Sequence, residues 1–201
     1  MSPKVGIEPI RQAQIIRAAL SLIAKQGSHN VSIQDVATEA RLSKGAVLHY
    51  YPTKEELFAA VFREFFRRIF ERSKRTMATH EDPLEKLRSF GDWLFDANDP
   101  AVNPGYPLYF ECMARAVYED SFSSLFREWV NNWIELLEGA IEEGIRRGEF
   151  RRVNSETAAR SLSAFCQGIA SRWYLDRERH PTEWARETLR DYAETLLKKK
   201  L

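Results

Sequence analysis

Two short helical segments around a tight turn constrain the fold of this chain more than any other feature. Residues 32–54 read SIQDVATEARLSKGAVLHYYPTK. Ser32 is a favourable N-cap, and Asp35 puts a negative charge in the first helical turn. Apolar residues then recur at helical spacing on one face, at Ile33, Val36, Ala37 and Ala40. The pattern predicts a short amphipathic helix.

A second short helix follows the turn. Ser43 is its predicted N-cap, and the helix spans Lys44–Tyr50, about two turns. The inward alanines of the first helix let the second cross closely, and Leu42 fills the space between them. Thr53 then opens a third helix, with Glu56 in capping-box register. This arrangement predicts a helix-turn-helix whose second helix enters a DNA major groove.

The stretch ARLSKGAVLHYYPTKEEL at residues 40–57 resembles the signature of the TetR family of one-component transcriptional repressors. The resemblance implies an all-α fold, with a three-helix DNA-binding domain at residues 1–54 that contains the helix-turn-helix. Residues 55–201 would form a helical domain for effector binding and dimerisation. By the same resemblance, the groove would be faced by Lys44, Gly45, Ala46 and His49, and phosphates would be held by Ser32, Ser43, Tyr50 and Lys54.

A narrower resemblance lies upstream. Residues 3–16, PKVGIEPIRQAQII, are similar to the start of the BetI-type repressors, the choline-responsive members of that family. In such proteins an arginine just before the first helix reaches a phosphate or the minor groove, which implies this role for Arg11. The alternative is that Arg11 belongs to a solvated N-terminal arm.

Arg41 departs from the family pattern, because such turns usually carry glycine at this position. A left-handed backbone would cost arginine roughly 1 kcal/mol relative to glycine. Either the turn avoids a positive φ angle or the strain is tolerated. Arg41 is also placed to add a phosphate contact.

Composition limits the class of protein. The chain has 201 residues, of which 44% are hydrophobic and 29% charged, so it is too apolar to be disordered. Residues 1–54 carry a net charge of +4 and the remainder −3, which favours an anionic partner for the N-terminal part. No apolar run approaches the ~20 residues of a membrane span, and no signal peptide is recognised. We therefore expect a cytoplasmic protein without a membrane partner.

Cys112 and Cys166 are expected to be buried packing residues rather than a disulfide or a redox switch.

The rest of the chain reads as helices. The expected elements are a helix ending near Gly27, a long helix from Thr53 to about Thr79, and helices at 83–97, through Cys112 to Tyr118, and at 121–148, 154–179 and 182–199. A loop is expected around Pro100, Pro104, Gly105 and Pro107. The family resemblance implies that the last two helices pair with those of a second subunit; the alternative is that they complete a monomer core. A homodimer would read two half-sites ~34 Å apart or a multiple of that distance.

Aromatic residues gather in the C-terminal part, where all five tryptophans lie. They predict a small-molecule pocket, although core packing explains each residue individually. A cationic, choline-like effector would favour aromatic faces beside a carboxylate. The predicted ligand-binding residues are Trp93, Phe110, Glu111, Trp133, Phe165 and Trp173.

The sequence bears on two other function classes. The four histidines are isolated, and the sequence contains no HExxH, GxSxG, phosphate-cradling glycine loop or CxxC. We therefore expect no enzyme activity, metal or cofactor. An all-helical protein–protein interaction module without a DNA role would explain the apolar helix faces, but it gives no reason for Lys44, His49, Tyr50 and Lys54.

Overall fold

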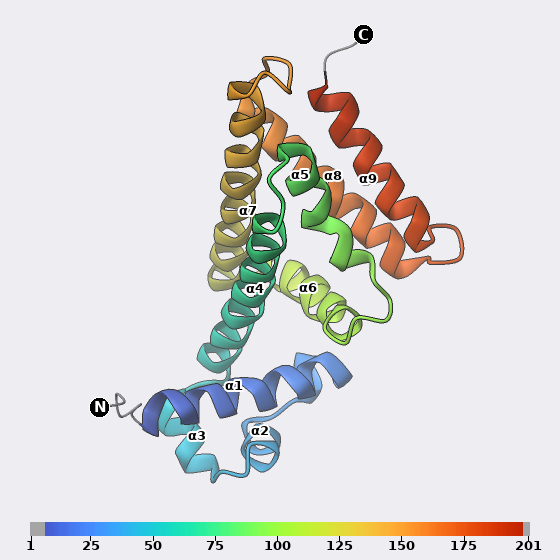
Figure 1. Cartoon of the computed structure of the whole chain (residues 1–201). Helices are drawn as coiled ribbons and strands as arrows, with labels where there is room; N and C mark the ends of the chain where they lie inside the picture. Colours follow the sequence, from blue (N-terminus) through green and yellow to red (C-terminus); the bar gives the residue numbers. More distant parts are fainter. Residues whose placement is uncertain (1–6, 199–201) are drawn as a thin grey trace. The chain divides into compact units, whose positions relative to one another are not determined.

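The computed structural model describes residues 7–198, and these are mostly helical (Figure 1). The elements are α1 (Ile7–Gln26), η1 (Ser28–Asn30), α2 (Ile33–Glu39), α3 (Lys44–Tyr50), α4 (Lys54–Ala78), α5 (Pro83–Asp92), η2 (Trp93–Phe95), α6 (Val102–Ala116), α7 (Asp120–Arg146), α8 (Ser155–Leu175) and α9 (Thr182–Leu197). No strand occurs within residues 7–198, so the predicted all-α fold is confirmed. Residues 3–6 of the BetI-like segment and the predicted helix end at Lys199 lie outside the described residues.

Internal contacts group the chain into two compact units. Unit 1 contains the described chain up to Arg67 together with Pro104–Phe126. Unit 2 contains Arg68–Asn103 and the described chain from Arg127 onwards. Helices α4, α6 and α7 each contribute residues to both units. The functional division at residue 54 stays a prediction.

Unit 1 contains the predicted helix-turn-helix, with α2 packed against both α1 and α3. Val36 and Ala37 of α2 and Val47 of α3 are fully buried, and Ala40 at the end of α2 is 3% exposed. Small side chains at positions 37 and 40 leave room for α3 to approach. The local pattern therefore predicted Val36, Ala37 and Ala40 of the inward face correctly, whereas Ile33 is only half-buried.

Unit 2 is held together by α9, which packs against α5 and α8. Gly91 on α5 allows a close approach, because a Cβ atom there would lie only 2.5 Å from Cδ2 of Leu189 on α9. The buried core of this unit includes Leu137, Leu162 and Trp173. Among the described residues, no helix is both long enough and apolar enough to cross a membrane.

The loop predicted around Pro104, Gly105 and Pro107 is wrong, because these residues lie inside α6. Pro104 occupies the first turn of that helix, where a backbone N–H has no intrahelical acceptor to lose. Pro107 cannot donate to the carbonyl of Asn103, and this oxygen accepts a hydrogen bond from the Tyr174 hydroxyl at 3.4 Å. The helix predicted at 83–97 is also shorter, since α5 ends at Asp92 and continues as η2.

Candidate functional site

The N-terminus of α2 is closed by a complete capping box. The Ser32 hydroxyl oxygen accepts from the Asp35 amide at 3.1 Å, while the Asp35 carboxylate accepts from the Ser32 amide at 2.8 Å and from its hydroxyl at 2.7 Å. These bonds from Ser32 hold the pKa of Asp35 below its ordinary value. The Ser32 hydroxyl is therefore already a donor within the protein, and a phosphate would have to compete with Asp35 for it.

Helix α3 begins and ends at the predicted residues. The Ser43 hydroxyl accepts from the Ala46 amide at 3.1 Å, which fixes the first turn. Three of the predicted groove residues are exposed, namely Lys44, Gly45 and His49, whereas Ala46 and Tyr50 are half-buried. With Val47 turned into the core, α3 presents a polar outer face whose N-terminal end carries small and basic residues. Such a face suits entry into a major groove.

The turn between α2 and α3 adopts the strained conformation considered for Arg41, whose φ angle is 54°. Among the described residues other than glycine, this is the one positive φ angle. The strain is tolerated because backbone bonds close the turn: the Arg41 amide donates to Thr38 at 3.0 Å, and the Leu42 amide donates to Ala37 at 2.8 Å. The turn holds the exposed Arg41 side chain next to the start of α3.

The expected position of Arg11 before the first helix is wrong, because α1 begins at Ile7 and Arg11 lies half-buried within it. A neighbouring side chain ties Arg11 to the same turn. Its guanidinium donates to the Gln14 side chain at 3.2 Å, and the Gln14 amide group donates to the carbonyl of Ala40 at 2.6 Å. Sequence reasoning missed Gln14. No local pattern marks a side chain whose partner is a backbone oxygen 26 residues away.

Lys54 begins α4, and its ammonium lies 5.1 Å from the centre of the Phe58 ring. The Thr53 hydroxyl accepts from the Glu56 amide at 3.1 Å, which is one of the two bonds expected from a capping box. The charge of Lys54 also helps, as the smallest of the causes, to lower the pKa of Asp35.

The predicted ligand-binding residues are divided between the two units. Phe110 and Glu111 belong to unit 1, whereas the other four belong to unit 2. The ring centres of Phe110 and Tyr109 are 5.4 Å apart. Both carboxylate oxygens of Glu111 accept from the backbone amide of Ser28, at 3.0 and 3.1 Å.

Two of the ligand-binding candidates in unit 2 have cations over their rings. The Arg72 guanidinium lies 4.1 Å from the Trp93 ring, and that of Arg177 lies 4.4 Å from the Trp173 ring. The Trp173 indole donates to the Thr182 hydroxyl at 3.1 Å. A cationic ligand would find one face of each of these rings already covered.

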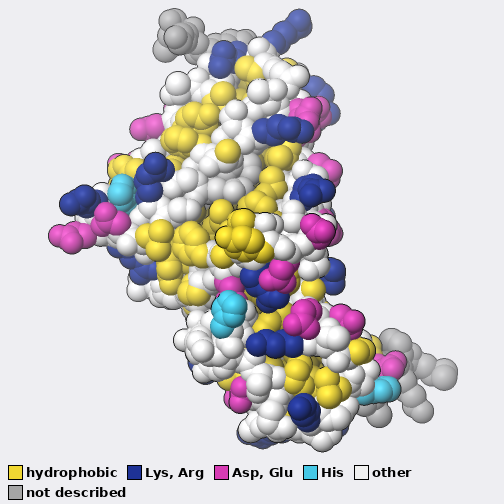
Figure 2. Space-filling model, turned by 180° about the vertical axis from the view of Figure 1, so that it is seen from behind, with side chains coloured by type: hydrophobic (Ala, Val, Ile, Leu, Met, Phe, Trp, Pro, Cys, Tyr) yellow, Lys and Arg dark blue, Asp and Glu magenta, His cyan; other side chains and the backbone are white. Residues whose placement is uncertain are grey.

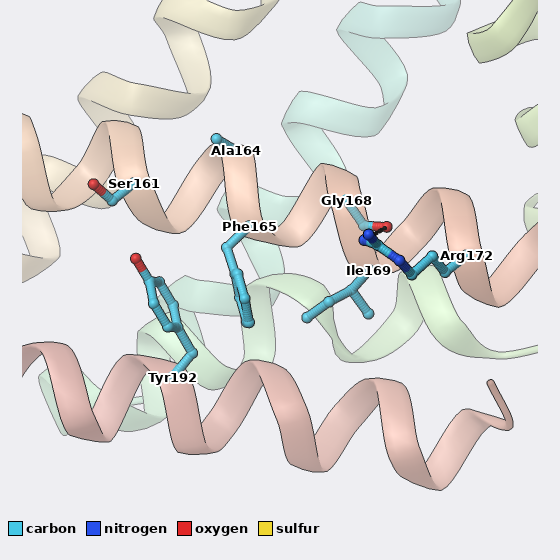
Figure 3. A pocket seen from close by; sticks show the side chains of 7 residues that line it. All are labelled: Ser161, Ala164, Phe165, Gly168, Ile169, Arg172 and Tyr192. Atoms are coloured by element: carbon cyan, nitrogen blue, oxygen red, sulfur yellow. Dashed lines mark hydrogen bonds between the residues drawn. The ribbon is translucent and has the colours of Figure 1, made fainter.

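Trp133 and Phe165 have different surroundings. Trp133 is 2% exposed and packs edge-on against Phe90, with ring centres 4.3 Å apart. Its indole N–H is buried and finds no acceptor among the described residues. Phe165 stacks on Tyr192 at 3.9 Å in an open groove of about 440 Å³ between α8 and α9, where the other lining residues are Ser161, Ala164, Gly168, Ile169 and Arg172 (Figure 3).

Both cysteines are buried free thiols, as the sequence predicted. Burial raises the pKa of Cys112 and of Cys166 to about 12, so both remain protonated at neutral pH. Within residues 7–198, no group of three His, Cys, Asp or Glu residues is arranged to hold a metal ion.

Comparison with known proteins identifies the family. Residues 15–61 match the model of bacterial regulatory proteins of the tetR family, and residues 83–198 match that of the BetI-type transcriptional repressor C-terminal domain. The HTH-type transcriptional regulator BetI of Ectopseudomonas mendocina is 31% identical, with 98% of each chain covered. That of Paraburkholderia xenovorans is 29% identical, with 97% of each chain covered.

Solved structures agree on the fold. A TetR transcription regulator from Haloarcula marismortui is 29% identical, with a TM-score of 0.82 over 94% of this chain and all of its own. A transcriptional regulator from Saccharomonospora viridis, solved in complex with choline, has a TM-score of 0.83 at 21% identity, with 94% of this chain and 98% of its own covered. With the capped helix-turn-helix and the match of the C-terminal part, these findings show that the chain belongs to the BetI-type repressors of the TetR family.

Proposed function

We propose that this repressor binds a near-palindromic operator as a homodimer and releases it when a small molecule occupies its C-terminal part. The observation that carries the proposal is the outer face of α3, where Lys44, Gly45 and His49 are exposed behind a capped first turn. One helix of two turns reads few base pairs, so selectivity calls for two such helices related by a dyad. Because operator binding requires access to DNA, we place the protein in the cytoplasm. We also assign the chain no catalytic activity.

The proposed DNA contacts fall into two groups. Lys44, Gly45, Ala46 and His49 would face base edges, where the small residues permit close approach. The others would hold phosphates or reach the minor groove: Arg11, Ser32, Ser43, Tyr50 and Lys54. In the second group Ser43 is better placed than Ser32, because the Ser32 hydroxyl already donates to Asp35.

The groove between α8 and α9 supports dimerisation through the last two helices. Phe165 and Tyr192 stack within an open groove, which leaves aromatic surface available to a second subunit. On the face of the molecule in Figure 2, hydrophobic side chains gather in bands with charged side chains interspersed. Apolar groove surface with polar residues beside it, here Ser161 and Arg172, marks association sites in soluble proteins.

Analytical ultracentrifugation of the full chain tests the dimer. Wild-type protein is expected to sediment with twice the mass of one chain. Tyr192→Arg places a charge in the groove and should shift the equilibrium to monomers. Asp191→Asn, at an exposed neighbouring position on α9, makes the same change in net charge and should leave the dimer intact. Equal dimerisation of both variants would place the interface elsewhere.

The effector that fits best is a small cation carrying an acceptor oxygen, as in choline. The choline complex of the Saccharomonospora viridis regulator supports this class. The buried indole N–H groups of Trp93 and Trp133 find no acceptor among the described residues, and a ligand oxygen would supply one. Trp133 is the first candidate in unit 2, where Trp93 and Trp173 are also proposed, while Phe165 is a candidate only if the dimer leaves the groove between α8 and α9 open. In unit 1, Phe110 and Glu111 are proposed as separate contacts. A carboxylate has about four lone-pair sites, so Ser28 leaves Glu111 with accepting capacity.

Release requires that the effector bind one arrangement of the two helix-turn-helix units of the dimer better than the other. A ligand that binds both arrangements equally well does not shift the equilibrium between them. Helix α4 is the proposed carrier of this bias. It runs without interruption from Lys54 in unit 1 to Ala78 in unit 2. A displacement of one end of this continuous helix would therefore displace the other end.

Fluorescence anisotropy tests the proposal. The protein is titrated against labelled DNA from upstream of its own gene and against scrambled DNA, at two salt concentrations. Specific binding is expected to exceed the control by at least ~10³-fold, and choline or betaine aldehyde should release the operator and change tryptophan emission. Equal binding to both duplexes, persisting on genome-selected DNA, would refute operator recognition. A lack of response to both compounds would refute the choline-like effector alone.

A further inference from the structure

A carboxylate on α6 holds the connection between α1 and α2. Both oxygens of Glu111 accept from the amide of Ser28, at 3.0 and 3.1 Å. Ser28 is 3% exposed, and it follows Gly27, where a positive φ angle of 74° ends α1. A hydrogen bond to an ionised acceptor is about twice as strong as one between neutral groups. The Glu111 carboxylate therefore holds η1 in place through a strong hydrogen bond to the Ser28 amide.

This attachment lies close to the start of the helix-turn-helix. The Val31 amide donates to the Ser28 carbonyl at 3.2 Å, and Val31 is 1% exposed. The next residue, Ser32, is the N-cap of α2. Since only three residues separate Ser28 from Ser32, the position of the Ser28 amide limits where α2 can begin. Figure 1 shows α6 facing the C-terminal end of α1, from which η1 continues.

One turn further along α6, Arg115 makes a second attachment within the same unit. Its guanidinium lies 3.8 Å from the Phe122 ring and 5.8 Å from the Phe58 ring, and it donates to Glu119 at 2.8 and 2.7 Å. Lys54 lies over the same Phe58 ring at 5.1 Å. Helix α6 therefore contacts the segment before α2 through Glu111 and the first turns of α4 through Arg115.

We infer that Glu111 is a positioning residue for operator binding, which acts through the Ser28 amide and sets where α2 and α3 meet the DNA. The inference rests on operator binding by these two helices. The direction of the change in DNA affinity tests this inference, because lost charge and lost positioning change the affinity in opposite directions. Removing a negative charge from unit 1 would by itself strengthen DNA binding, because the phosphate backbone is anionic. Loss of positioning would weaken it.

The test compares Glu111→Gln and Glu111→Ala with Asp120→Asn in the full-length protein. Asp120 is exposed in the first turn of α7 and belongs to the same unit, so its variant makes the same charge change without touching Ser28. Operator and scrambled duplexes are titrated by anisotropy. Hydrogen exchange of the segment 28–31 reports on the Ser28 amide, and circular dichroism checks that each variant is folded.

Both Glu111 variants are expected to lose about tenfold in operator affinity, with faster exchange at Ser28 and with binding to scrambled DNA equal to that of Asp120→Asn. Asp120→Asn is expected to bind the operator as tightly as wild type or slightly more tightly. Operator affinities of the Glu111 variants that equal that of Asp120→Asn would overturn the inference, as would unchanged exchange at Ser28. Wild-type protein that binds both duplexes equally would instead refute operator recognition, and the exchange data would then still report on the Glu111–Ser28 bond.

Discussion

The side-chain amide of Gln14 donates to the carbonyl of Ala40 at 2.6 Å, which ties α1 to the turn of the helix-turn-helix. The same side chain accepts from Arg11 at 3.2 Å. One residue therefore positions both the turn and a proposed minor-groove contact. Because Ala40 is 3% exposed, its carbonyl has little access to water that would replace the bond.

Gln14→Met keeps the size of the side chain and removes the donor. We expect the free energy of unfolding to fall by about 1–3 kcal/mol, because the buried carbonyl of Ala40 loses its donor and water has little access to replace it. Urea unfolding followed by circular dichroism measures the change. Gln12→Met, at an exposed position of the same helix, is the control. Equal stability of the two variants would contradict a role for the Gln14–Ala40 bond.

Arg41→Gly removes the strain of a positive φ angle from the turn. Glycine adopts this conformation freely but costs more entropy on folding, so we expect a net gain of up to about 1 kcal/mol in the free energy of unfolding. Thermal unfolding measures it. Arg41→Lys retains both strain and charge and should not gain stability. If Arg41 contacts a phosphate, the glycine variant will bind all DNA more weakly while being more stable.

Lys54→Ala should weaken binding to operator and scrambled DNA by the same factor. One lost phosphate contact reduces the slope of log K against log salt by about 0.9. Anisotropy titrations at several salt concentrations determine this slope. Unchanged affinity at every salt concentration would mean that Lys54 serves only its contact with Phe58.

His49→Ala should alter sequence preference instead. The side chain is exposed on the outer face of α3, where a reading helix meets base edges. We expect a loss of discrimination at one or two base pairs of each half-site, with the salt dependence unchanged. Binding to a library of single-base operator variants shows which positions relax. A uniform loss across all positions would indicate a phosphate contact at His49.

Acid sensitivity is expected from Asp99 in unit 2. The hydrogen bond from Arg72, assisted by the Ala101 amide at 2.9 Å, holds the pKa of Asp99 below its ordinary value of 3.8. A carboxyl whose pKa is lowered by folding stabilises the protein above its unfolded-state pKa, and this contribution is lost as the pH falls through the folded-state value. Asp99→Asn should therefore be less stable than wild type at neutral pH, and the difference should shrink between about pH 5 and about pH 3. A constant difference across that range, measured by urea unfolding, would assign the stabilisation to packing.

Some features of this protein were accessible from the sequence because the interactions that create them are local. Ser32 and Ser43 cap helices through amides three residues away, and the bounds of α3 follow from such contacts. The inward face of α2 follows from helical periodicity in the same way. The family signature around these residues extended the prediction to an all-α repressor.

The remaining features depend on partners distant in the sequence. Proline chemistry favoured a loop at Pro104 and Pro107, yet α6 includes both, and the Tyr174 hydroxyl donates to the carbonyl that Pro107 leaves without its helical donor. The Glu111–Ser28 and Gln14–Ala40 bonds join residues separated by 83 and 26 positions. Thus the sequence alone determined the capped reading helices, because each cap is satisfied within one helical turn. Only the tertiary structure decided how those helices are held, because it brings together side chains and backbone groups that no local pattern relates.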